Sequence, residues 1–163
     1  MNESLRQQLV QHRHDPMRQY ELAGITVATV KAFVLEEMAI AEDWDTQSLL
    51  LCMVYSIDDP SIKADALNHL LVMPGHSQHQ AVTFEIQKLK SPTSIPYIRT
   101  VLESGFDFLS YTCSDDGVIA KWFSHALASI GTPEAIDLIK LYAKSGNAEV
   151  AEEMAYRLEK IEP

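Results

Sequence analysis

Cysteine is scarce in this sequence, and long apolar runs are absent from it. Only Cys52 and Cys113 occur among 163 residues, and two isolated thiols build no disulfide framework. The longest apolar run, residues 49–55, is far shorter than the roughly 20 residues that a membrane helix needs. Residues 1–18 contain no apolar segment of the kind that marks a secretory signal. We therefore expect a cytoplasmic protein with reduced thiols and no membrane partner.

The usual signatures of catalysis and metal binding are also missing. The sequence contains no GxSxG, no glycine-rich phosphate loop, no HExxH and no CxxC. His12, His14 and Asp15 are close in sequence, but a helix places residues i and i+2 on different faces. His76 and His79 could share a face and hold zinc, but a catalytic zinc needs at least three ligands and no third has matching spacing. We expect a protein that is not an enzyme and that needs neither cofactor nor metal.

Basic side chains are few. The chain has 13 Lys and Arg against 23 Asp and Glu, which gives a formal net charge of −10. Such a field repels nucleic acid and anionic membranes, and it speeds the encounter with a basic partner. We expect another protein, basic in character, as the partner, and we expect no nucleic acid. Solubility alone explains the charge equally well.

The chain does contain a repeated helix. Residues 91–105, SPTSIPYIRTVLESG, align without gaps with residues 132–146, TPEAIDLIKLYAKSG. Ser91 and Thr132 suit the N-cap, and the proline after each suits the first helical position. An apolar pair on one face and a final glycine, which is typical of the left-handed position after a helix, complete both copies. These residues are Ile95, Ile98 and Gly105, matched by Ile136, Ile139 and Gly146.

The match extends into the neighbouring helices. Three apolar positions recur in three segments: Val82, Ile86 and Leu89, then Phe123, Leu127 and Ile130, then Met154, Leu158 and Ile161. The first and second segments are 41 residues apart, and the second and third are 31 residues apart. The additional residues of the longer spacing lie in an insertion at residues 106–117. The repeat unit is therefore a helix pair with a period of the kind that marks solenoids.

The rest of the chain fits the same scheme less clearly. Asp59 and Pro60 open a helix whose apolar face is Ala64, Leu67, Leu70 and Leu71. Residues 20–45 read as one long helical pattern, and residues 1–14 as an N-terminal helix. No segment alternates with a period of two between hairpin turns, so we expect essentially no strand. We predict an all-α protein of about nine helices in a single domain, residues 1–163, with weaker repeats at 20–90 and clearer repeats at 91–161.

The C-terminal part resembles the bacterial HEAT-like repeats of about 31 residues. The resemblance rests on the turn from Ala126 to Gly131, the following Thr132–Pro133 and the next apolar helix. The chain departs from that family in lacking most of the Arg and Asp that link neighbouring repeats. The resemblance implies a right-handed α-solenoid of antiparallel helix pairs, with an extended concave surface for a protein partner.

The function that this resemblance implies is protein binding without catalysis. Free-standing bacterial proteins with such repeats resemble immunity proteins that silence toxins. Together with the acidic charge, the resemblance implies an inhibitor that neutralises a basic protein such as a toxin. An assembly or regulatory adaptor is the alternative. A HEAT-like enzyme or a chromophore lyase is a more remote alternative.

Two regions supply the candidate partner-binding residues. Residues 36–59 contain no Lys or Arg, and from them we select Glu42, Asp43, Asp45, Asp58 and Asp59. Trp44, which lies between two acids, is either an interface anchor or a side chain tucked under the turn.

The second region is the insertion, from which we select Phe108, Tyr111, Asp115 and Asp116. The insertion is either an extra helix packed on its own repeat or a binding loop, because insertions in repeat proteins gather on one face.

Overall fold

The computed structural model describes residues 1–161, and most of these residues are helical. Helix accounts for 75% of the structure, and the described residues contain no strand. Ten α-helices and two 3-10 helices lie in this part of the chain, where the sequence predicts about nine helices. The all-α prediction is confirmed. None of the described helices combines the length and the apolar character that crossing a membrane requires.

The chain divides into two compact units, Met1–Gln78 and His79–Pro163. The first unit contains five α-helices, and its core lies where α4 packs against α1, α3 and α5. The five helices are α1 (Glu3–Gln11), α2 (Pro16–Ala23), α3 (Val30–Met38), α4 (Trp44–Tyr55) and α5 (Pro60–Val72).

The start of α5 follows the sequence closely. The carboxylate of Asp59 accepts hydrogen bonds from the backbone N–H groups of Ser61 and Ile62, at 2.8 and 3.2 Å. Pro60 takes the first helical position. All four residues of the predicted apolar face are buried. The predicted cap, start and inward face of this helix are confirmed.

The two N-terminal predictions are wrong in their boundaries. The predicted helix at residues 1–14 ends at Gln11, and a separate helix, α2, begins at Pro16 with Asp15 as its cap. The predicted long helix at residues 20–45 is broken into α2, α3 and the start of α4. Gly24 stops α2 because it adopts the left-handed conformation, with φ of 66°. Thr29 then turns the chain by accepting a hydrogen bond from the N–H of Thr26.

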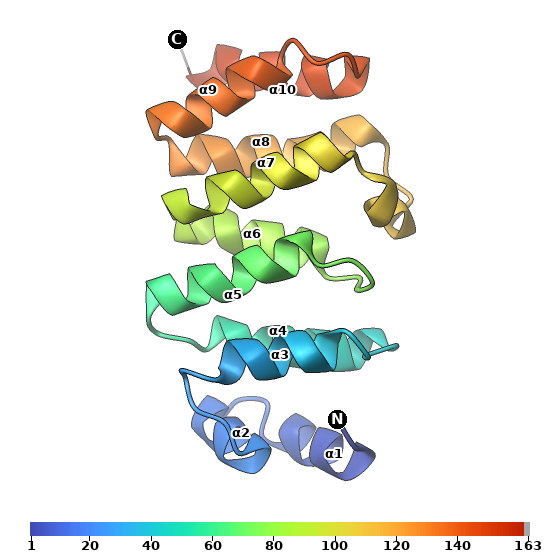
Figure 1. The fold of residues 1–163 in the computed structure, drawn as a ribbon, viewed down its shortest axis with the longest axis vertical. Helices are drawn as coiled ribbons and strands as arrows, with labels where there is room; N and C mark the ends of the chain where they lie inside the picture. Colours follow the sequence, from blue (N-terminus) through green and yellow to red (C-terminus); the bar gives the residue numbers. More distant parts are fainter. Residues whose placement is uncertain (162–163) are drawn as a thin grey trace. The chain divides into compact units, whose positions relative to one another are not determined.

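The second unit is built from helix pairs. Its elements are α6 (His79–Leu89), the 3-10 turn η1 (Pro92–Ser94), α7 (Ile95–Ser104), the 3-10 helix η2 (Asp107–Thr112), α8 (Asp116–Ile130), α9 (Pro133–Tyr142) and α10 (Ala148–Ile161). Helix α8 packs between α6 and α10 (Figure 1). Helix α9 packs on α8 and α10, and α7 packs on α8 and α9.

The repeated apolar positions face inward as the sequence predicts. Val82, Ile86, Phe123, Leu127 and Met154 are fully buried, and the remaining members of the three triplets are half-buried. Thr132 also caps α9 as predicted, because its hydroxyl accepts a hydrogen bond from the N–H of Ala135 at 3.3 Å.

The predicted cap at Ser91 is wrong. Its hydroxyl bonds to that of Thr93 instead, a 3-10 turn follows, and α7 begins only at Ile95. An α-helix that began at Pro92 would need the backbone nitrogen of Pro96 to donate to the carbonyl of Pro92, and proline has no N–H. Asp137 occupies the matching position in the second copy, so α9 can begin at its proline.

The two terminal glycines also differ. Gly105 follows α7 with a positive φ of 74°, but its ψ of −178° lies outside the left-handed helical conformation that the sequence predicts. Gly146 has no positive φ, and α9 already ends at Tyr142. The N–H groups of Lys144 and Ser145 reach back three residues to the carbonyls of Leu141 and Tyr142, which closes α9 with tightened turns. The prediction that Gly146 ends this helix in the left-handed conformation is wrong.

Candidate binding surfaces

The acidic residues selected in the first unit are exposed, but two of them also cap helices. Asp43 accepts a hydrogen bond from the N–H of Thr46 at 2.8 Å, at the start of α4. Hydrogen bonds from Thr46 lower the pKa of Asp43, and those from Ser61 and Ile62 lower the pKa of Asp59. These carboxylates therefore stay ionised while they stabilise local structure. Glu42, Asp45 and Asp58 are also exposed.

Trp44 is the first residue of α4, and 61% of its surface is exposed. It is therefore not tucked under the turn. Trp44 is an exposed indole beside several carboxylates, and it therefore remains a candidate anchor for a partner.

The insertion packs against the second unit. Leu109 is fully buried, and the ring of Phe106 stacks on that of Phe123 with 6.1 Å between centroids. Phe108 meets the ring of His79 edge to face, at 5.2 Å. Of the two alternatives for this segment, an extra helix packed on its own repeat fits the structure better than a binding loop. The helix is a 3-10 helix and not an α-helix.

Tyr111 fixes the insertion to the start of α6. Tyr111 is 41% exposed, but its hydroxyl lies 3.0 Å from Nδ1 of His79 and accepts a hydrogen bond from the backbone N–H of His79. Burial raises the pKa of the Tyr111 hydroxyl, so it stays protonated. Asp115 is exposed beside the start of α8, while Asp116 accepts a hydrogen bond from the side chain of Asn147.

The two histidines considered for zinc each have protein partners. The ring of His76 lies against the carbonyl of Leu70 at 2.8 Å and accepts from the N–H of Gln78 at 3.1 Å. Burial lowers the pKa of His76, which favours the neutral ring. Within residues 1–161, no group of three or more His, Cys, Asp and Glu side chains is placed to hold a metal ion.

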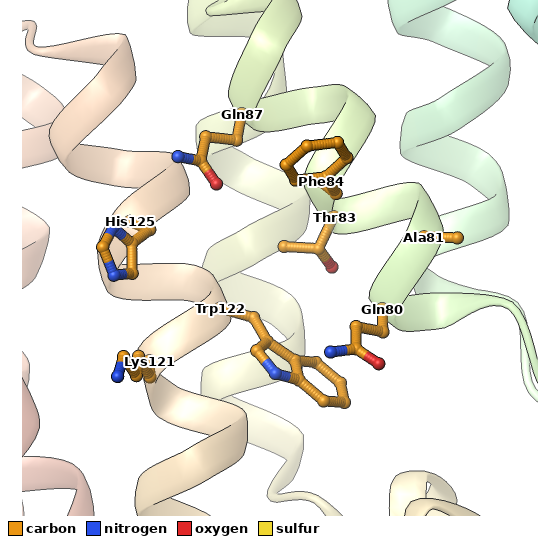
Figure 2. Close-up of a pocket in the computed structure, with 8 residues that line it drawn as sticks. All are labelled: Gln80, Ala81, Thr83, Phe84, Gln87, Lys121, Trp122 and His125. Atoms are coloured by element: carbon orange, nitrogen blue, oxygen red, sulfur yellow. The ribbon is translucent and has the colours of Figure 1, made fainter.

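The sequence did not single out a hollow in the second unit that the structure shows. A groove of about 540 Å³ runs between α6 and α8, and we name it the α6–α8 groove (Figure 2). Phe84, which is 58% exposed, and Trp122 supply aromatic surface from opposite sides. The other lining residues are Gln80, Ala81, Thr83, Gln87, Lys121 and His125. The lining of this groove contains no carboxylate.

A second groove of about 400 Å³ lies on the other side of α8, towards α10, and we name it the α8–α10 groove. Four carboxylates line it, together with Gly117, Val118 and Tyr156. Lys121 lines both grooves, so it stands between an aromatic surface and an acidic one. The four carboxylates are those of Asp115, Glu149, Glu152 and Glu153.

A polar network joins α8 to α10 at these grooves. Arg157 donates to the hydroxyl of Ser124 at 3.1 Å, to Nε2 of His125 at 2.8 Å and to Glu153 at 3.0 Å. Ser124 in turn donates to Glu153 at 2.6 Å. Burial, and then the charge of Arg157, lower the pKa of His125, so its ring is neutral and accepts from Arg157. The network fixes the shared wall of the two grooves.

The repeat itself carries the signal that could have located this surface. Phe84, His125 and Tyr156 occupy equivalent positions, separated by the steps of 41 and 31 residues. Each lies two residues after a buried apolar residue, and a helix turns such a position away from the core. A large side chain therefore recurs on the outward face of α6, α8 and α10.

Comparison with known proteins finds no relative of this chain. No family model matches the chain, and neither a curated protein nor a solved structure is significantly similar to it.

Proposed function

We propose that the chain is a right-handed α-solenoid of HEAT-like helix pairs that acts as a protein-binding module without catalytic activity. The recurring buried positions in α6, α8 and α10 support the repeat architecture. Helix pairs that bury one face against their neighbours leave the outer faces of successive helices side by side, where a partner can contact several repeats.

The α6–α8 groove carries this proposal. Phe84 and Trp122 present aromatic surface to solvent in a hollow, and aromatic residues concentrate at protein interfaces. Exposed aromatic side chains gathered in a hollow are typical of a surface that a partner covers, and the Lys88 ammonium lies 5.5 Å from the centroid of the Phe84 ring. A protein partner therefore explains this surface better than solubility does.

We propose a basic protein as the partner, and inhibition of that protein as the biological role. The net charge of −10 and the four carboxylates of the α8–α10 groove favour a cationic surface. An immunity protein that neutralises a basic toxin is the best specific form of this role. The acidic residues of the first unit would speed its association.

Affinity capture tests the proposal. The immobilised full chain should retain a basic protein from an extract of the cells that produce it, and elevated salt should release that protein. The double variant Phe84→Ala, Trp122→Ala should lose it, whereas Leu141→Ala should retain it. Leu141 is a matched control, since it is 55% exposed on α9 and lines neither groove. Retention by the double variant, or a captured protein that is acidic, would count against the proposal.

An adaptor for several partners is the second candidate, and the lack of a carboxylate in the α6–α8 groove favours it. An adaptor would bind through apolar contacts alone, so its complexes would change little with salt. A single complex that weakens steeply with salt supports the inhibitor instead.

An enzyme or chromophore lyase is the remote candidate, because the volume of the groove falls in the range of small-molecule sites. Lys121 and His125 are its ionisable lining residues, and no Ser, Cys or carboxylate nucleophile lines it with them. The arrangement therefore supports binding better than catalysis.

A further inference from the structure

We propose that the two grooves bind one extended segment of the basic partner, with an apolar or aromatic side chain in the α6–α8 groove and an arginine three residues away in the α8–α10 groove. This inference rests on the proposed function and adds to it the chemistry and the spacing of the recognised segment.

The α6–α8 groove suits an uncharged side chain. Phe84 and Trp122 offer apolar surface, and the single formal charge in the lining is that of Lys121. A cationic side chain placed here would meet Lys121 without a carboxylate to offset it. Burial of an aromatic or aliphatic side chain against these two rings gains apolar contact without that repulsion.

The α8–α10 groove suits an arginine. Four carboxylates face one lysine in its lining, so a cation is favoured there. Glu153 already accepts from Arg157, and Glu149 accepts from the N–H of Gly117, so both are fixed in place. Glu152 and Asp115 are exposed, which leaves them available to a guest. The planar guanidinium can bind a carboxylate with two parallel hydrogen bonds, which an ammonium group cannot do.

The spacing follows from the distance between the grooves. They lie on the two sides of α8, and packed helices stand about 8–10 Å apart, so the grooves are separated by roughly that distance. A polyproline II segment rises about 3.1 Å per residue with three residues per turn, so residues i and i+3 lie on one side about 9 Å apart. A β-strand places its same-side residues about 7 or 13 Å apart, and neither distance fits.

An extended guest also suits the polar groups of the first groove. The amide side chains of Gln80 and Gln87 line it from α6 (Figure 2). Each amide can donate and accept, so the two can bind the N–H and C=O groups of an extended backbone. A helical guest already uses these backbone groups internally, and it would leave the two amides without that role.

Short peptides test the inference directly on the full chain. Proline-containing, fluorescent peptides would carry Phe and Arg three positions apart, in either order, and comparison peptides would place them one or five positions apart. A helix-forming peptide with Phe and Arg seven positions apart tests the other geometry. We expect one of the matched peptides to bind about fivefold more tightly than the comparison peptides, as the loss of one surface contact would give.

Variants assign each half of the segment to its groove. Trp122→Ala should weaken the matched peptide about tenfold, as the loss of an aromatic anchor does. The pair Asp115→Asn, Glu152→Gln should weaken it about fivefold and reduce its salt dependence. Asp137→Asn, an exposed acid on α9 outside both grooves, should change nothing. Lys121→Gln should improve binding of the matched peptide about two- to fivefold, because it removes a repelling charge.

Three results would overturn the inference: equal binding at every spacing, tighter binding of the helical peptide, or weaker binding after Lys121→Gln. If the chain captures a basic protein through Phe84 and Trp122 but shows any of these results, the inference that an extended segment binds both grooves is wrong and the proposed function stands. If the groove variants affect neither the peptides nor the captured protein, both proposals are wrong.

Discussion

At the scale of single residues, several polar side chains that look available in the sequence are already committed to structure. Tyr111 was selected as a binding residue, yet its hydroxyl holds the start of α6. His125 lines a groove, yet its ring accepts from Arg157. Such partners come from helices that are distant in sequence, so no local pattern reveals them. The sequence shows which hydrogen-bonding groups a side chain carries, but it does not show whether another residue of the fold already bonds to them.

The bond between Tyr111 and His79 makes Tyr111→Phe destabilising. The change leaves the ring in place and removes the acceptor of a backbone N–H, so the free energy of unfolding should fall by about 1 kcal/mol. Urea denaturation measures this change. Tyr156→Phe is the control: Tyr156 is 49% exposed, and the loss of its hydroxyl should cost less than about 0.5 kcal/mol. Equal stability of Tyr111→Phe and the unaltered chain would show that the insertion does not depend on this bond.

The network around His125 predicts a loss of stability in mild acid. The pKa of His125 is lowered in the folded unit, from an ordinary value of 6.5, by burial and by the positive charges of Arg157 and Lys121, while Glu153 opposes this shift. The unfolded chain therefore binds this proton at a higher pH than the folded chain does. As a consequence, the free energy of unfolding falls as pH drops below 6.5 and continues to fall until the folded-state pKa is reached.

The variant His125→Gln tests the sign of this effect. Glutamine can still accept from Arg157 but does not titrate, so its free energy of unfolding should fall less between neutral and mildly acidic pH. His14→Gln, at an exposed position, should follow the unaltered chain. Chemical denaturation at a series of pH values gives the comparison. A His125→Gln profile parallel to that of the unaltered chain would contradict the prediction.

At the scale of elements, the sequence predicts helix starts well where one residue decides them. Asp59 and Thr132 cap α5 and α9 as expected, because a side chain two or three residues from its donor is a local matter. Ser91 fails because Pro96, five residues later, cannot donate the bond that an early start requires. The grooves were missed for a further reason: the apolar pattern of α6 locates its buried face at Val82 and Ile86, but it does not show which outward residues of α6 and α8 meet across a hollow.

The two glycines that align in the repeat should respond differently to substitution. Gly105 has φ of 74° with ψ of −178°, a backbone region that is almost restricted to glycine, so Gly105→Ala should cost about 1–3 kcal/mol. Gly146 has no positive φ, and an added Cβ would meet no atom within 4 Å. Gly146→Ala should therefore be neutral or stabilising, by up to about 1 kcal/mol. Urea denaturation of the two variants decides this, and a larger cost at Gly146 than at Gly105 would be inconsistent with the backbone described above.

At the scale of the whole molecule, the charge is spread over both compact units but not evenly. The first unit holds eleven acidic and five basic side chains, a net charge of −6, and the second holds twelve and eight, a net charge of −4. The all-helical class, the excess of acid and the repeat were readable from the sequence, because each is a property of composition or of period. The grooves depend on which residues of neighbouring helices meet, and composition does not contain that information.

This distribution predicts that association and release depend on different parts of the chain. Asp43, Asp45, Asp58 and Asp59 of the first unit are exposed and largely screened by solvent, so they should attract a basic partner at a distance and contribute little once it is bound. Replacing Asp43, Asp45, Asp58 and Asp59 with Asn should slow association with the captured basic protein and leave its dissociation nearly unchanged. Asn is the suitable replacement, because it can still cap α4 and α5.

Surface plasmon resonance at several salt concentrations measures both rates. The Debye length shrinks from about 10 Å at 0.1 M salt to about 3 Å at 1 M, so the association rate of the unaltered chain should fall steeply with salt and that of the fourfold variant less steeply. Trp122→Ala should instead speed dissociation, because an aromatic anchor acts within the formed complex. If the fourfold variant speeds dissociation while its association rate stays the same, the acids of the first unit contact the partner directly, and the binding surface extends beyond the two grooves.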